Sequence, residues 1–169
     1  MGQSIESRFI RYSSIIERVR QVVHECGRDS IVFLEGYAFA SKTAGVVLAE
    51  FGGLLRRMLL SEIKPGNLHE IPPTSLKIFV TNHGAAKKPV MAESAFRRWG
   101  AELSGDDEVD AYCLWRFGRA FLGLDEAEDA VQVRAIENVR NPVKKSRKQK
   151  PVDASAESRV RKKRRGRNL

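Results

Sequence analysis

Cysteine, histidine and long apolar runs are all scarce in this sequence. Its two cysteines, Cys26 and Cys113, lie far apart and outside any CxxC spacing, which argues against a disulfide framework and a zinc ribbon. His24 lies two residues before Cys26, but this spacing points the two side chains to different faces of a helix. No apolar run has the length of a transmembrane helix or the pattern of a signal peptide. We therefore expect a reduced, intracellular protein with no membrane partner.

Positive charge is unevenly distributed along the 169 residues. Residues 140–169 contain 13 Lys or Arg against two acidic residues and so carry +11, which leaves residues 1–139 at about −2 of the total of +9. The basic segment lacks aromatic residues and has few large apolar ones, so burial cannot offset the entropy lost on ordering it. The sequence predicts one compact domain, residues 1–139, followed by a disordered basic tail, residues 140–169.

A tail of this charge density is typical of proteins that bind phosphate backbones, with sequence-independent and salt-sensitive affinity. The alternatives are a solubilising tail or a pair of nuclear-localisation-like clusters, and no apolar anchor supports a membrane surface. We expect DNA as the partner and a cytoplasmic or nucleoid-associated location, or the host nucleus for a eukaryotic or viral chain. The candidate DNA-binding residues of the tail are Lys144, Lys145, Arg161, Lys162, Lys163, Arg164 and Arg165.

Hydrophobic periodicity predicts helices that alternate with short strands in the compact domain. The first helix is expected to start at Ser14, because Ser14 and Glu17 form a capping-box pattern, and to stop at Gly27. Strands that alternate with helices predict an α/β layer structure with parallel pairing. The expected order is a helix over 14–26, a strand over 31–37, a helix over 42–62, a loop over 65–73, a strand over 75–81, a helix ending near Gly100, and helices over 111–123 and 125–140.

Two features of this pattern are unusual. Two strands make a poor parallel sheet, because such a sheet is normally covered on both faces and extended on both edges. Gly52 and Gly53 lie in the middle of the second helix, where each costs about 1 kcal/mol relative to alanine. A close approach of another backbone would explain this pair of glycines.

Acidic residues cluster at one place in this basic chain. The stretch SGDDEVDAY, residues 104–112, holds four carboxylates within five residues, more than the capping of one helix requires. Asp107 and Asp110 share one helix face, and Glu35 interrupts an apolar strand, where an unpaired carboxylate is costly to bury. Helix capping and an edge-strand glutamate facing solvent are the simpler explanations. Taken together, the three carboxylates predict an oxygen-liganded site for a hard divalent cation.

Several stretches of the sequence are weak signals of a family when taken singly, but their combination in this order is specific. The first predicted helix is followed by FLEGYAF, AEFGGLLRRML, PPTSLKIFVTNHGAAKK and DDEVDAYCLWRFG, over roughly residues 13–122. In this order they resemble the RuvC-type Holliday-junction resolvases of the ribonuclease H-like superfamily, particularly divergent phage forms. The resemblance implies a ribonuclease H-like α/β domain and a homodimer. It also implies an Mg²⁺- or Mn²⁺-dependent endonuclease that cuts four-way or branched DNA in recombination, repair or phage DNA processing.

The resemblance assigns catalysis and metal binding to Glu35, Asp107 and Asp110. Two ions held in this way clamp the attacking and leaving oxygens of a phosphodiester and lower the pKa of the nucleophilic water. Asp106 and Glu108 are then flanking or capping residues.

Basic and aromatic side chains surround these positions in the sequence. Lys77, Lys87 and Lys88 frame a loop that leads into a helix N-terminus, where backbone N–H groups favour a phosphate. In the family, basic residues here contact DNA or steady the transition state, and the alternative is solvated surface lysines. Tyr37 and Phe39 are candidates for stacking on a splayed base or for core packing.

The sequence departs from the family at its start. Those enzymes begin with a strand that carries a further catalytic aspartate, followed by two more strands. Here MGQSIESRFIRY lies directly before the first predicted helix, and Glu6 is a poor substitute for that aspartate. We therefore expect a domain truncated of its first strands, with an open edge on the strand over 31–37. The interpretations are a truncated or split form, a fragment completed by a partner chain, or a mis-assigned start. The alternative function is a non-catalytic DNA-binding remnant, or a nuclease subunit that needs a partner for the aspartate strand.

Overall fold

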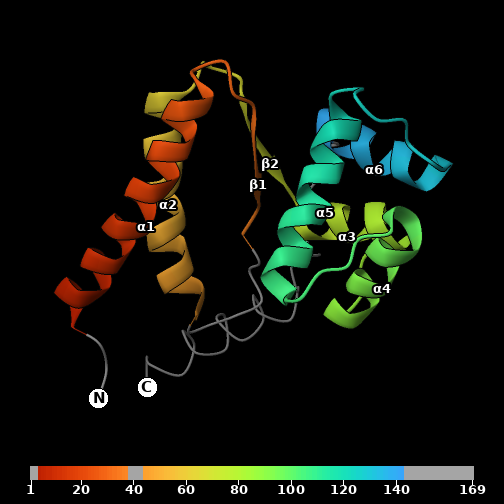
Figure 1. Ribbon diagram of the computed structural model, residues 1–169, viewed down its shortest axis with the longest axis horizontal. Helices are drawn as coiled ribbons and strands as arrows, with labels where there is room; N and C mark the ends of the chain where they lie inside the picture. Colours follow the sequence, from red (N-terminus) through yellow and green to blue (C-terminus); the bar gives the residue numbers. More distant parts are fainter. Residues whose placement is uncertain (1–3, 38–43, 143–169) are drawn as a thin grey trace, which may run out of the picture.

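The computed structural model describes residues 4–37 and 44–142 and arranges them as helices on both sides of a small sheet (Figure 1). Residues 143–169 of the predicted tail, and Phe39, lie outside the described residues. None of the helices in the described part of the chain is long and apolar enough to cross a membrane. The elements are α1 Ile5–Cys26, β1 Val32–Glu35, α2 Ala44–Glu62, β2 Leu68–Ile71, α3 Pro73–Thr81, α4 Lys88–Trp99, α5 Asp106–Phe121 and α6 Ala130–Arg140.

β1 and β2 form a two-stranded parallel sheet, which confirms the predicted α/β class and parallel pairing. Val32 lies opposite Leu68, and Glu35 lies opposite Ile71. The N–H groups of Val32 and Gly36 donate to carbonyls on the β2 side, so the backbone groups of the alternate residues, including Glu35, face the other edge. Within residues 4–37 and 44–142 no strand pairs with that edge.

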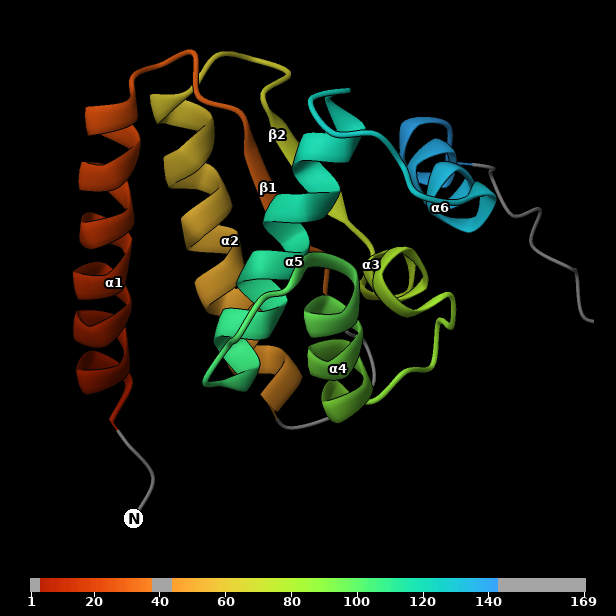
Figure 2. The same cartoon turned by 45° about the vertical axis from the view of Figure 1, so that its right-hand side comes forward.

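The sheet separates two hydrophobic clusters because successive side chains of a strand point to opposite faces. Val32 and Leu34 pack with the smaller cluster, whose buried members come from α1, α2 and the turn after α2. Phe33 packs on the other face against the larger cluster, formed by β2 and helices α3 to α6. Figure 2 shows α1 and α2 on one side of the strands and α5 on the other.

The first helix starts much earlier than the sequence predicted. The Ser4 hydroxyl accepts a hydrogen bond from the Ser7 N–H at 3.2 Å, and the helix begins at Ile5. Ser14, expected as the cap, is an exposed mid-helix residue, so the predicted start was wrong. Buried Tyr12 explains the longer helix, because its hydroxyl donates to the carbonyl of Val47 at 3.2 Å and ties the first turns to α2.

The segment from 65 to 81 was also predicted wrongly. The expected loop over 65–73 contains strand β2, and the expected strand over 75–81 belongs to helix α3. Pro73 lies in the first turn of α3, where a missing N–H costs no helical hydrogen bond. Leu76, Phe79 and Val80 recur at the helical spacing and form its buried face.

Only one of the two mid-helix glycines is needed for a close approach, and the neighbour is a side chain rather than a backbone. A Cβ on Gly52 would lie 2.9 Å from the Tyr37 ring, whereas Gly53 faces open space. The Arg56 guanidinium covers the Tyr37 ring, 4.1 Å from its centroid. Tyr37 is therefore half-buried against α2 and belongs to neither hydrophobic cluster, so base stacking and core packing both stay open for it.

Candidate functional site

Gly118 allows helix α5 to lie directly against strand β1. A Cβ at this position would be 2.7 Å from Cδ2 of Phe33, closer than real contacts. The Phe33 ring is itself held between His69 and Phe121, with centroid distances of 5.1 and 5.6 Å. Glu35 points to the same face as Phe33, and Asp110 lies about two turns before Gly118 on α5. This contact therefore sets Glu35 beside Asp110.

Glu35 and Asp110 lie close enough to influence each other's charge. The Glu35 side chain reaches solvent, but partial burial of its carboxyl raises its pKa above the ordinary 4.5, and the negative charge of Asp110 raises this pKa further. The cations Lys77 and Lys88 act in the opposite direction. The site is thus a pair of repelling carboxylates with two lysines at its border.

Lys88, the first residue of α4, provides the nearest positive charge. Its Nζ lies 3.4 Å from Oδ2 of Asp110 and 3.5 Å from Oδ2 of Asp106. The Lys88 side chain is about half exposed, at 50%. Desolvation lowers the pKa of Lys88, but Asp110 and, to a smaller extent, Asp106 together raise it by more, so the net shift is upward. Lys88 therefore neutralises part of the negative charge of the site.

The other two acidic residues of the stretch 106–110, Glu108 and Asp107, differ in their contacts. Glu108 accepts hydrogen bonds from the N–H and the hydroxyl of Ser104, both at 2.9 Å, and these bonds lower its pKa. Glu108 thus ties Ser104, the residue before the N-cap Gly105, to the first turn of α5, in keeping with the flanking or capping role expected for it. Asp107 is exposed in the first turn of α5, and it makes no ion pair with any other described residue. Across residues 4–37 and 44–142, no three His, Cys, Asp or Glu side chains gather as a metal-binding group.

The predicted DNA-binding lysines of the compact domain lie on two helices at this end of the molecule. Lys77 is half-buried on α3 and Lys87 is the exposed N-cap residue of α4, next to Lys88. The seven predicted residues of the tail, from Lys144 to Arg165, lie outside the described residues. The structure thus brings together Glu35, Asp110, Lys77 and Lys88.

Sequence reasoning missed two residues that shape the site. Gly118 is a helix-interior glycine within an apolar stretch, a signal of close contact that the sequence analysis did not use. Lys88 was considered for phosphate binding but not as an ion-pair partner of Asp110. Its pairing depends on the angle between α4 and α5, which no local pattern shows.

Comparison with known proteins gives one informative result. No protein-family model matches the chain, and no curated protein matches it at a significant level. A solved structure of RuvC from Thermus thermophilus matches with a TM-score of 0.51, over 73% of this chain and 76% of that chain, at 20% sequence identity. The fold is RuvC-like. The expected resemblance to RuvC-type proteins is therefore confirmed at the level of the fold.

Proposed function

We propose that this chain is a metal-dependent nuclease domain that acts on four-way or otherwise branched DNA. One observation carries the proposal: in a RuvC-like fold, Glu35 at the end of β1 lies beside Asp110 on α5. The family resemblance of the sequence gives metal-binding roles to these two residues and to Asp107. Recombination, repair or phage DNA processing is the cellular setting that this activity fits.

The carboxylates fit a hard divalent ion such as Mg²⁺ or Mn²⁺. Burial raises the pKa of Glu35 and the charge of Asp110 raises it further, which shows that the two carboxylates lie close enough to repel each other. Oxygen ligands of this kind are the ones that such ions prefer in proteins. Glu35 and Asp110 would hold the ion, with Asp107 one turn earlier on the same helix as the third ligand. The bound ion would supply an activated water and stabilise charge on the phosphodiester.

The basic side chains give the proposal its substrate class. Lys77 and Lys88 border the carboxylates, and the exposed Lys87 lies next to Lys88, so an anionic backbone approaching the site meets cations first. The tail, with its charge of +11, adds sequence-independent affinity for duplex DNA.

Metal binding can be tested by thermal unfolding with and without Mg²⁺ or Mn²⁺. An ion that binds only the folded chain raises Tm by mass action. Asp110→Asn should lose most of this gain and Asp107→Asn part of it. Glu102→Gln, which removes an exposed carboxylate outside α5, should keep the gain and serves as the control. Equal shifts in all four proteins would refute the metal site and leave helix capping as the explanation of the acidic cluster.

A second candidate is a DNA-binding subunit that is completed by a partner strand. The open edge of β1 favours it, because an unpaired edge accepts a further strand. Incubation of residues 1–169 with a four-way junction and Mg²⁺ separates the candidates. Cleavage that Glu35→Gln abolishes supports an enzyme that is active alone. Binding without cleavage supports the subunit. Absence of both would refute the DNA proposal.

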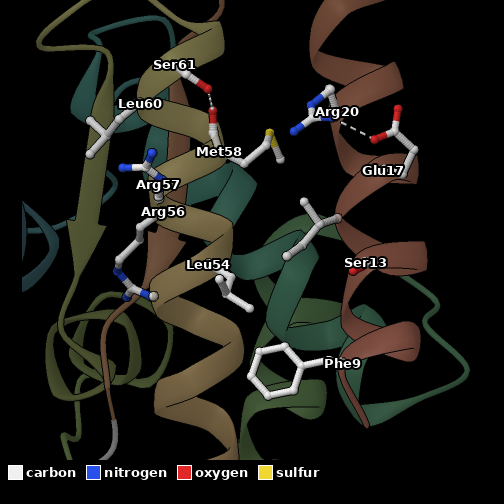
Figure 3. A pocket seen from close by; sticks show the side chains of 12 residues that line it. Phe9, Ser13, Glu17, Arg20, Leu54, Arg56, Arg57, Met58, Leu60 and Ser61 are labelled. Atoms are coloured by element: carbon white, nitrogen blue, oxygen red, sulfur yellow. Dashed lines mark hydrogen bonds and ion pairs between the residues drawn. The ribbon is translucent and has the colours of Figure 1, made fainter. Parts of the chain in front are cut away.

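A homodimer is part of the same proposal, and helix α2 offers a surface for it. A groove of about 1070 Å³ between α1 and α2 is lined by apolar side chains that include Phe9, Ile16 and Leu54 (Figure 3). Leu60, also on this groove, is 62% exposed. An antiparallel contact between two copies of α2, centred between Gly53 and Leu54, would place Glu50 opposite the partner's Arg57. Glu50 also pairs with Arg8 of its own chain at 3.2 Å, so it would be shared between the two cations. The charges of α2 are therefore complementary to a second copy of itself.

Charge reversal tests this dimer. Arg57→Glu should produce a monomer in analytical ultracentrifugation, because like charges would then face each other across the contact. Arg134→Glu makes the same charge change on the exposed face of α6 and should leave the dimer intact. A monomeric parent, or a dimer that survives Arg57→Glu, would refute the α2 contact.

A further inference from the structure

Lys88 occupies a position that conflicts with the proposed ion. Its ammonium lies 3.4 Å from Asp110 and 3.5 Å from Asp106, and it is close enough to Glu35 to lower the pKa of that carboxyl. The protein thus already supplies a cation to the carboxylates.

An ammonium and a divalent ion cannot both use this site fully. The Oδ2 of Asp110 that faces Lys88 is less available to a metal while the ion pair persists. Two cations held a few Å apart also repel each other, and a half-exposed site screens this repulsion only in part. Binding of the ion therefore requires the Lys88 side chain to move away or to accept an unfavourable interaction.

We propose that Lys88 competes with the divalent ion for Asp110 and so sets the affinity of the site. The inference rests on the proposed metal site. In the metal-free protein, Lys88 neutralises Asp110 and Asp106. When an ion binds, the ammonium is released toward solvent, where an anionic ligand can use it. Metal and anion are then expected to bind with positive coupling. Metal binding frees the Lys88 ammonium for the anion, and anion binding draws that ammonium away from the Asp110 carboxylate that the metal needs.

Isothermal titration with Mn²⁺ alone, at fixed pH, tests the competition. Lys88→Met keeps most of the length of the side chain and removes the charge. We expect it to tighten Mn²⁺ binding by about tenfold or more, the size of effect that one nearby unit charge has on a partly solvated ion. Lys87→Met removes the same charge from the neighbouring N-cap residue, which makes no ion pair with the described residues, and should change the affinity much less.

The outcomes distinguish the competition by Lys88 from the metal site on which it rests. Tighter binding by Lys88→Met, or binding by that variant when the parent binds none, supports competition. Unchanged or weaker binding by Lys88→Met, with clear binding by the parent, overturns the role of Lys88 and leaves the metal site intact. No binding by either protein refutes both. Thermal unfolding in EDTA shows whether each variant is folded. Lys88 is exposed at a helix N-terminus, where a positive charge is unfavourable, so its removal should not destabilise the helix.

Discussion

Substitution of Gly118 by alanine should displace helix α5 from strand β1. The new Cβ would lie 2.7, 2.8 and 3.1 Å from three ring atoms of Phe33, and that ring cannot retreat because His69 and Phe121 lie against it. Overpacking of this kind costs about 1–3 kcal/mol. With a rigid neighbour we expect the upper end of that range. Alanine regains about 1 kcal/mol of helix propensity. The expected net loss is therefore about 2 kcal/mol, or a Tm lower by roughly 5–10 °C.

A double-mutant cycle with Phe33→Leu isolates the contact. Leucine lacks the ring edge, so Gly118→Ala should be nearly neutral or stabilising in the Phe33→Leu background, measured by urea unfolding. The metal-dependent rise in Tm should shrink in Gly118→Ala alone, because α5 carries Asp110. A single Gly118→Ala variant as stable as the parent would refute the close approach. Equal losses in both backgrounds would show that Phe33 is not the cause.

Three further predictions concern charge and exposure. The folded-state pKa of Glu35 lies above its ordinary 4.5, so the parent loses stability as pH rises from that value through the folded pKa. Over this window the free energy of unfolding of Glu35→Gln, measured with urea in the presence of EDTA, should rise relative to that of the parent. A difference between the two proteins that does not change with pH would contradict the shift. Burial, aided by the charge of Asp110, raises the pKa of the Cys113 thiol to about 12. A maleimide should therefore modify the exposed Cys26 in the native protein and Cys113 only after unfolding, and native labelling of Cys113 would show that its cluster opens readily. Removal of residues 143–169 should weaken duplex binding by orders of magnitude and flatten its salt dependence, whereas unchanged binding would assign the tail another role.

The sequence could predict those elements whose pattern matches their final environment. β1 is an apolar run whose half-buried side chains pack against helices, and α5 is a long helix with a consistent apolar face, so both were predicted in type. α3 was missed because its β-branched and aromatic composition favours a strand, while its helical spacing of Leu76, Phe79 and Val80 is short. β2 was missed because His69 and Glu70 interrupt its apolar pattern.

The candidate site could be predicted only in part. Glu35 stood out because a carboxylate within an apolar strand needs an explanation, and Asp110 because it shares a helix face with Asp107. That Glu35 lies next to Asp110 depends on the packing of α5 on β1, which is a tertiary contact made through Gly118 and Phe33. The ion pair of Lys88 depends on the same packing together with the position of α4. Local patterns identify such residues, but they do not give the angles between helices that bring them together.

The division of β1 between two cores has a consequence for partial unfolding. The cluster under α1 and α2 contains four buried residues, whereas the cluster of β2 and α3 to α6 contains twelve. Cooperative units with less buried apolar surface open at lower free energy. The α1–α2 half should therefore unfold locally while the other half stays intact. β1 would remain, because it is paired with β2 and its Phe33 ring is packed against α5, so only its Val32 and Leu34 side chains would lose their cover. Glu35 and Asp110 would then stay side by side while α1 and α2 open, and a ligand held by these two carboxylates would leave hydrogen exchange in α1 and α2 unchanged.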